Sequence, residues 1–251
     1  MLAEDRVDGL LVASGTPNSE LLELLTDIGK PSVLVNRAIP GIPSVVADDE
    51  AGSRLATEHL LLRGHRNILH LAGPVGLDTT DRREAGFLTA MRSTKGSTVG
   101  SRVHARGWGA RDGYAAGREL LEEVNGATAV FVANVTLAIG LYRAAHEVGI
   151  SIPSELSVVA LHDYDLAAML VPSLTTVSMP LYELGEVAVT HLLSALDGAP
   201  LGGYMIRTAP VVVERGSVSQ RGGRVQKRTV DEQTAGQADA LNVVGGLADV
   251  D

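Results

Sequence analysis

Short apolar runs alternate with amphipathic stretches along most of the chain. The first run, residues 7–13, is apolar almost throughout, which is typical of a strand buried on both faces of a sheet. The stretch after it places leucines at helical spacing and ends at Gly29, with Pro31 just beyond, and both residues are common after a helix. The alternation continues past residue 200. It predicts an α/β protein in which helices cover parallel sheets.

The same pattern gives the expected elements. Strands are expected at residues 7–13, 32–36, 44–47, 68–72, 99–105, 129–133, 156–161, 174–177 and 211–214. Helices are expected at residues 21–28, 49–63, 80–92, 112–124, 136–148 and 182–196. From about Val218 neither period is visible, so residues 218–251 are expected to be a disordered tail.

Composition excludes several classes of protein. The 251 residues fit one large domain or two small lobes. The sequence contains no run of eighteen apolar residues, so it predicts no membrane-spanning helix. The N-terminus lacks a secretory signal pattern, so a cytoplasmic location is expected. The absence of cysteine excludes disulfides, thiolate nucleophiles and cysteine zinc sites. A net charge of −9 argues against nucleic-acid binding by these residues themselves.

Motifs for catalysis, metals and cofactors are missing from the sequence. No phosphate-binding loop occurs, and the glycines around Trp108 have the wrong spacing for a dinucleotide fingerprint. His59, His65 and His70 fall on a helix, its end and a strand, so structural roles are expected rather than metal binding. No serine lies in a nucleophile elbow. We therefore expect neither an enzyme nor a bound cofactor.

Polar and aromatic residues gather at the carboxyl ends of the expected strands, where open α/β sheets bind small molecules. Asn36, Asn134 and Asp163 each follow a strand. Arg83 lies early in a helix, and Trp108, the single tryptophan, follows another strand. Each residue alone fits a helix cap or a loop hydrogen bond. Together they suit a polyol, because amides, a carboxylate and a guanidinium bind hydroxyls and an indole stacks on a sugar ring.

Several sequence runs resemble the core of the lactose-repressor (LacI/GalR) family of bacterial transcription regulators. The runs are VDGLLV at 7–12, DDEAG at 48–52, RGHRNI at 63–68, REAGF at 83–87, TAVFVAN at 128–134 and PSLTTV at 172–177. Their order and spacing hold from about residue 7 to residue 217. The resemblance implies a periplasmic-binding-protein-like fold, in which two α/β lobes joined by three crossovers hold a sugar or related effector.

The resemblance also implies lobe boundaries and site residues. Residues 1–47 and 177–201 would form the N-terminal lobe, without its first βαβ segment, and residues 48–176 and 202–217 the C-terminal lobe. The implied effector-binding positions are Asn36, Thr79, Arg83, Trp108, Asn134 and Asp163. Family members act as homodimers on operator DNA, so we expect a homodimer that binds DNA only through a helix-turn-helix headpiece absent from this chain.

Asn36 stands where an aspartate is common in the family, and two further positions depart from the family pattern. Val135 stands where an aspartate is usual, and Met179 where a glutamine is usual. The loss of an acid and an amide indicates an unusual effector or a degenerate site. An alternative interpretation is therefore a stand-alone or vestigial cytoplasmic solute-binding module that does not act on DNA. The sequence does not identify the effector.

Overall fold

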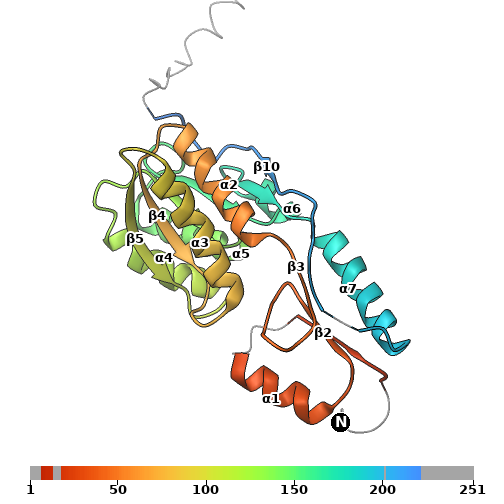
Figure 1. Cartoon of the computed structure of the whole chain (residues 1–251). Helices are drawn as coiled ribbons and strands as arrows, with labels where there is room; N and C mark the ends of the chain where they lie inside the picture. Colours follow the sequence, from red (N-terminus) through yellow and green to blue (C-terminus); the bar gives the residue numbers. More distant parts are fainter. Residues whose placement is uncertain (1–6, 14–17, 201, 222–251) are drawn as a thin grey trace, which may run out of the picture. The chain divides into compact units, whose positions relative to one another are not determined.

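The computed structural model describes residues 7–13, 18–200 and 202–221, which form two sheets with their covering helices (Figure 1). The six-stranded sheet has the order β10 (Val211–Val213), β8 (Thr175–Ser178), β7 (Ser157–Leu161), β6 (Ala129–Val132), β4 (Asn67–Ala72) and β5 (Thr98–His104). The four-stranded sheet has the order β1 (Leu10–Val12), β2 (Ser32–Val35), β3 (Ser44–Val46) and β9 (Gly203–Met205). Among the described strands, only β10 and β8 pair antiparallel. The expected α/β class with parallel sheets is confirmed.

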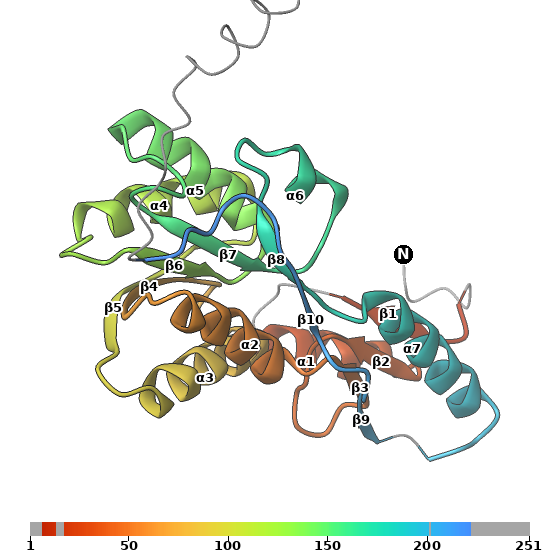
Figure 2. The same ribbon diagram turned by 90° about the horizontal axis from the view of Figure 1, so that it is seen from above.

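Helices cover both faces of the six-stranded sheet. α2 (Asp49–Leu62) and α3 (Asp78–Ser93) lie on one face, and α4 (Ala110–Glu122) and α5 (Val135–Val148) on the other (Figure 2). Successive residues of a strand point to opposite faces, so Phe131 packs in the α2–α3 core and Val130 in the α4–α5 core. All of β6 is therefore buried, which explains its unbroken apolar sequence. The short helix α6 (Asp165–Met169) follows β7.

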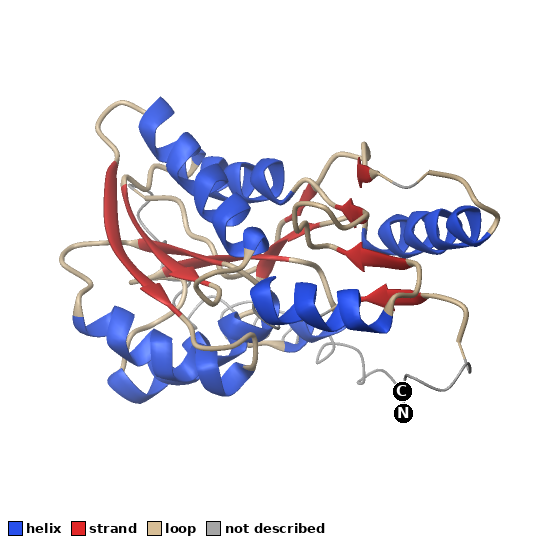
Figure 3. Cartoon of the chain, turned by 60° about the horizontal axis from the view of Figure 1, so that its bottom comes forward, coloured by secondary structure: helices blue, strands red, loops and turns tan. Residues whose placement is uncertain are grey.

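The four-stranded sheet is also covered on both faces. Val33 of β2 packs against Leu184 of α7 (Leu181–Leu196). Its neighbour Leu34 packs against Leu21 of α1 (Asn18–Ile28), so the two helices lie on opposite sides of the strands (Figure 3). β1 is an edge strand of this sheet, where the Leu11 side chain is 42% exposed. Within the described residues, no helix combines the length and apolarity needed to cross a membrane.

Three connections join the two sheets, as the family resemblance implies: β3 to α2, β8 to α7 and β9 to β10. The strand pairing corrects the expected lobe boundaries. Tyr204 of β9 pairs with Val45 of β3, and Ile206 packs in the same core, so residues 203–206 belong with the four-stranded sheet and not with the expected segment 202–217. All of β8, through Ser178, belongs to the six-stranded sheet. The sequence did not reveal β9, because its three residues are all exposed and show no apolar alternation.

The start of the expected disordered tail is also corrected. The Ser217 hydroxyl donates to the Val158 carbonyl at 2.6 Å. His65 Nε2 lies 3.1 Å from the Ser219 carbonyl oxygen, and the Arg221 amide donates to the Arg63 carbonyl at 2.9 Å. Residues 218–221 therefore follow the six-stranded sheet in an ordered path, whereas residues 222–251 lie outside the described residues.

Candidate functional site

Five of the six expected site residues line one pocket of about 250 Å³, called here the inter-sheet pocket. It lies at the carboxyl ends of strands from both sheets, since Asn36 follows β2 while Asn134 and His162 follow β6 and β7. Its lining residues are Ala13, Val35, Asn36, Arg37, Leu77, Thr79, Arg83, Trp108, Asn134, Thr136, His162 and Tyr164. A ligand in this pocket would contact residues that belong to both sheets.

Arg83 is fixed within the pocket wall by three polar partners. Its Nε donates to Asp49 Oδ1 at 2.7 Å, its Nη1 to the Ala133 carbonyl at 2.9 Å and its Nη2 to His162 Nε2 at 3.3 Å. The guanidinium also lies 5.1 Å from the centre of the Trp108 ring. Only 3% of Arg83 is exposed. Its head group is therefore positioned before any ligand arrives, which lowers the entropic cost of binding.

Asp49 extends this arrangement to the connections between the sheets. Its second oxygen pairs with Arg82 Nη1 at 2.8 Å, and that nitrogen also donates to the Ala47 carbonyl at 2.7 Å. Arg82 Nη2 lies 3.1 Å from Asp78 Oδ2, which accepts from the Ala38 amide at 3.0 Å. The acidic residues thus join the pocket arginine to the chain on both sides of β3. A shift of Arg83 would therefore also displace its partner Asp49 at the β3–α2 connection.

The two pocket asparagines use their side-chain oxygens on the backbone. Asn36 adopts a left-handed φ of 54°, which asparagine tolerates, and its Oδ1 accepts from the Ala47 amide at 3.3 Å. Asn134 is the N-cap of α5, where its Oδ1 accepts from the Leu137 amide at 2.7 Å. Each asparagine retains an Nδ2 group with no hydrogen-bond partner among the described residues.

His162 was missed by the sequence prediction. It is only 8% exposed, and burial, reinforced by the charge of Arg83, lowers its pKa to about 3 although Asp49 opposes the shift. The ring is therefore neutral near pH 7. Because arginine can only donate, Nε2 of His162 is an acceptor and the proton of the neutral ring lies on Nδ1.

Asp163, by contrast, does not line the inter-sheet pocket. Its Oδ1 accepts from the Thr176 hydroxyl at 2.7 Å and lies 2.8 Å from Arg215 Nη1. Its Oδ2 accepts from Arg215 Nη2 at 3.2 Å. Burial works against ionisation, but the bonds from Arg215 and Thr176 keep the pKa of Asp163 below its ordinary value. The Asp163 carboxylate is therefore bound to Thr176 of β8 and to Arg215. The residue after β7 that lines the pocket is its neighbour His162.

Two of the residues that depart from the family pattern, Val135 and Met179, are packed in the core. Val135 is buried among the α4–α5 core residues, and Met179 among those of α2 and α3. A Cβ atom at Gly52 would lie 2.7 Å from the Met179 sulfur, so the thioether fills the space above that glycine. Neither side chain lines the inter-sheet pocket. At these two positions the side chains therefore serve core packing and do not contribute to the pocket.

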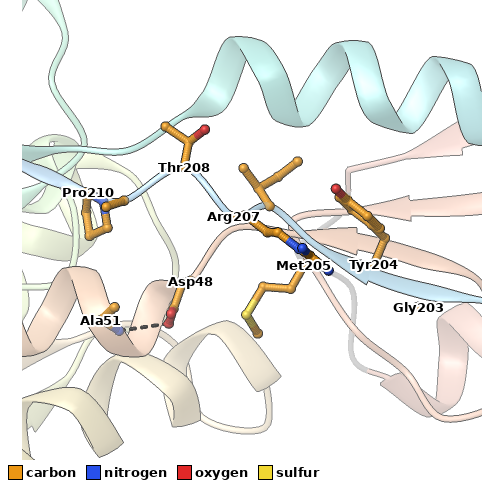
Figure 4. A pocket seen from close by; sticks show the side chains of 10 residues that line it. Asp48, Ala51, Gly203, Tyr204, Met205, Arg207, Thr208 and Pro210 are labelled. Atoms are coloured by element: carbon orange, nitrogen blue, oxygen red, sulfur yellow. Dashed lines mark hydrogen bonds between the residues drawn. The ribbon is translucent and has the colours of Figure 1, made fainter.

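A larger hollow of about 560 Å³ lies beside the connection from β9 to β10, near the start of α2 (Figure 4). Asp48 and residues 203–210 form most of its lining. Tyr204, Met205 and Arg207 are exposed, and Figure 4 shows the side chains spread along the segment instead of meeting at one point. Asp48 is occupied in capping α2 through the Ala51 amide. The smaller pocket, with its buried polar groups, is the better candidate site.

Two of the three histidines with expected structural roles, His65 and His70, bond to or stack on other residues of the protein. His70 is fully buried, and its ring stacks on Phe87 and Phe131 at centroid distances of 4.9 and 4.8 Å. His65 bonds to Thr128 and to the segment near Ser219. No group of three potential metal ligands occurs within the described residues.

The chain is similar in sequence to proteins of a known family. Residues 57–218 match the periplasmic binding protein-like domain family. The ribose operon repressor of Halalkalibacterium halodurans is 33% identical over 216 residues, which are 85% of this chain and 63% of the repressor. The chain thus spans less than two thirds of the length of that relative.

Two solved structures are also similar. A LacI family transcriptional regulator from Mycobacterium smegmatis is 34% identical, with a TM-score of 0.82 over 87% of this chain and 81% of the regulator. A LacI family regulator from Enterococcus faecium with bound ribose is 27% identical, with a TM-score of 0.72 over 87% and 82% of the two chains. These relatives are named as repressors or regulators, in agreement with the expectation that the chain is not an enzyme. The chain belongs to the LacI/GalR family and spans its periplasmic-binding-protein-like, ligand-sensing core.

Proposed function

We propose that the inter-sheet pocket binds a small-molecule effector, a sugar or a related metabolite, through Asn36, Thr79, Arg83, Trp108 and Asn134. The observation that carries the proposal is the preorganised guanidinium of Arg83 beside the indole of Trp108, in a pocket lined from both sheets. An indole and a fork of N–H donors suit the two faces of a sugar. His162 replaces Asp163 in this proposed site. The ribose bound to the Enterococcus faecium relative supports a ligand of this size.

Effector binding is proposed to regulate DNA binding by the whole protein. A ligand that contacts both sheets favours one arrangement of the lobes, and its differential affinity is the energy available for the switch. In the proposed mechanism the protein is a homodimer in the cytoplasm. Operator DNA would be bound by a helix-turn-helix headpiece outside this chain, because the net charge of −9 does not favour contact with DNA by these residues.

A fluorescence titration tests the pocket assignment. Trp108 is the single tryptophan, so its emission reports directly on the inter-sheet pocket. A thermal-shift panel of pentoses, hexoses, sugar phosphates, sugar acids and nucleobases identifies stabilising compounds, which are then titrated. We expect at least one compound to raise the Tm and to change the Trp108 emission saturably.

Isosteric variants test whether the change in Trp108 emission comes from binding at the pocket wall. Thr79→Val and Thr136→Val each remove one pocket hydroxyl and should weaken binding about three- to tenfold, the usual range for one neutral hydrogen bond. Thr190→Val, on the exposed face of α7, is the matched control and should bind as the wild type does. The proposed function would be contradicted by binding that leaves Trp108 emission unchanged, or by an affinity that is the same in the wild type and in both pocket variants.

A further inference from the structure

The charged groups that line the inter-sheet pocket are of one sign. Arg37 and Arg83 both contribute to its wall, and its described lining contains no aspartate or glutamate. Three acids near the pocket are absent from its described lining: Asp49 pairs with Arg83 and Arg82, Asp78 pairs with Arg82 and interacts electrostatically with Arg37, and Asp163 pairs with Arg215. A ligand in the pocket therefore meets guanidinium groups without meeting a carboxylate.

The amide side chains add donors to this wall. Both asparagine oxygens are taken by backbone amides, that of Asn36 by Ala47 and that of Asn134 by Leu137. The polar atom left on each is Nδ2, which carries two N–H groups. Each oxygen therefore already accepts one backbone hydrogen bond, and each asparagine can serve the pocket as a donor through Nδ2.

Arg83 and His162 also supply N–H donors to the pocket wall. Arginine has five N–H bonds, and three of those of Arg83 are directed at Asp49, Ala133 and His162, which leaves two. His162 accepts through Nε2, so its remaining ring nitrogen is an N–H donor. The hydroxyls of the lining, which can donate or accept, belong to Thr79, Thr136 and Tyr164. The side chains of the described lining are therefore rich in donors and poor in acceptors.

We infer that the effector carries an anionic group, a carboxylate or a phosphate, that is bound by Arg83, Asn36 and Asn134; this inference rests on the proposed function. A neutral polyol presents a proton on every hydroxyl, and among the described lining side chains only the hydroxyls of Thr79, Thr136 and Tyr164 remain as acceptors for those protons. An anion accepts from every donor, and charge-assisted bonds of this kind are the stronger ones. The sugar part would lie against the Trp108 ring.

Changing an asparagine to aspartate provides an isosteric test. Asn134→Asp keeps the oxygen that caps α5 and converts the free Nδ2 donor into a charged acceptor. Asn36→Asp does the same at a left-handed position that aspartate also tolerates. Asn125→Asp is the matched control, because Asn125 also has a positive φ of 40° but is exposed and does not line the pocket.

The probes are D-ribose, D-ribonate and D-ribose 5-phosphate, titrated into the chain while Trp108 emission is recorded at constant ionic strength. At least one anion should bind at least tenfold more tightly than ribose. Asn134→Asp and Asn36→Asp should each weaken that anion at least tenfold, whereas Asn125→Asp should leave it unchanged. Tighter binding of ribonate than of ribose 5-phosphate identifies a carboxylate ligand, and the reverse order a phosphate ligand.

Two results would overturn the inference. One is tighter binding of ribose than of both anions; the other is equal or tighter anion binding by the two pocket variants. Either result would leave the proposed function in place, because Trp108 would still report a ligand in the pocket. Failure of the proposed function is distinct, since the compound would then raise the Tm in the thermal-shift assay without a change in Trp108 emission.

Discussion

Arg83→Gln should be one of the most destabilising single changes in the pocket wall. The substitution removes a guanidinium that is 3% exposed and leaves the fully buried carboxylate of Asp49 with Arg82 as its remaining cation. Breaking a buried pair by removing one partner typically costs 3–5 kcal/mol. Because Arg82 stays 2.8 Å from the second oxygen of Asp49, we expect the lower end, about 3 kcal/mol. The Ala133 carbonyl also loses its bond from Arg83.

Urea denaturation followed by circular dichroism measures this loss. Arg54→Gln is the control, because Arg54 pairs with Glu58 at a distance of 3.0 Å on an exposed helix face and should contribute less than about 0.5 kcal/mol. The double variant Asp49→Asn with Arg83→Gln should recover part of the loss, since the buried carboxylate that retains only Arg82 as its cation is then gone. A loss below about 1 kcal/mol for Arg83→Gln, or one equal to that of the control, would refute the argument.

Three further predictions concern pH and packing. His70 keeps a pKa of about 3 because burial opposes its charged form, whereas the unfolded ring takes up a proton near pH 6.5; stability should therefore fall as the pH falls from 6.5 toward 3. At about 1.4 kcal/mol per pH unit, the loss of stability between pH 7.5 and pH 5 should be about 2 kcal/mol smaller in His70→Phe than in the wild type, by urea denaturation at both pH values. Gly140→Ala would place a Cβ 2.2 Å from the Ala110 carbonyl and should cost about 2–3 kcal/mol, while Gly185→Ala, with open space around it, should cost nothing; equal midpoints would count against close packing of α4 and α5. Gly73→Ala would place a Cβ 2.1 Å from the Trp108 ring, so a shifted emission spectrum is expected, and an unchanged spectrum would contradict this contact.

The fold was largely predictable because its strands are buried on both faces. β6 and β7 are buried at every position, so their sequences are unbroken apolar runs that stand out from the helices between them. Helix ends were equally clear, because Asp48 caps α2 and Gly149 follows α5 with a left-handed φ of 77°. β9 and the path of residues 218–221 depend on pairing with distant segments, and their own sequences carry no apolar period.

The site residues were predictable only where their position directly after a strand places them at the edge of the sheet. Asn36 and Asn134 follow strands and therefore lie at the edge where the pocket forms. The choice between His162 and Asp163 rests on a single residue beyond β7, where His162 has a φ of 69°. Sequence reasoning favoured the carboxylate because of its chemistry. The pairing of Asp49 with Arg83 was not predictable, since the two residues are 34 positions apart and nothing local reveals the pair.

Hydrogen–deuterium exchange with and without the tightest-binding compound of the panel tests the central claim most directly. A ligand in the inter-sheet pocket should slow exchange both in residues 33–38, at the end of β2, and in residues 133–138, at the start of α5. Residues 203–210, beside the larger hollow, should show no comparable slowing. Slower exchange confined to one sheet, or to residues 203–210, would contradict a ligand held between the two sheets.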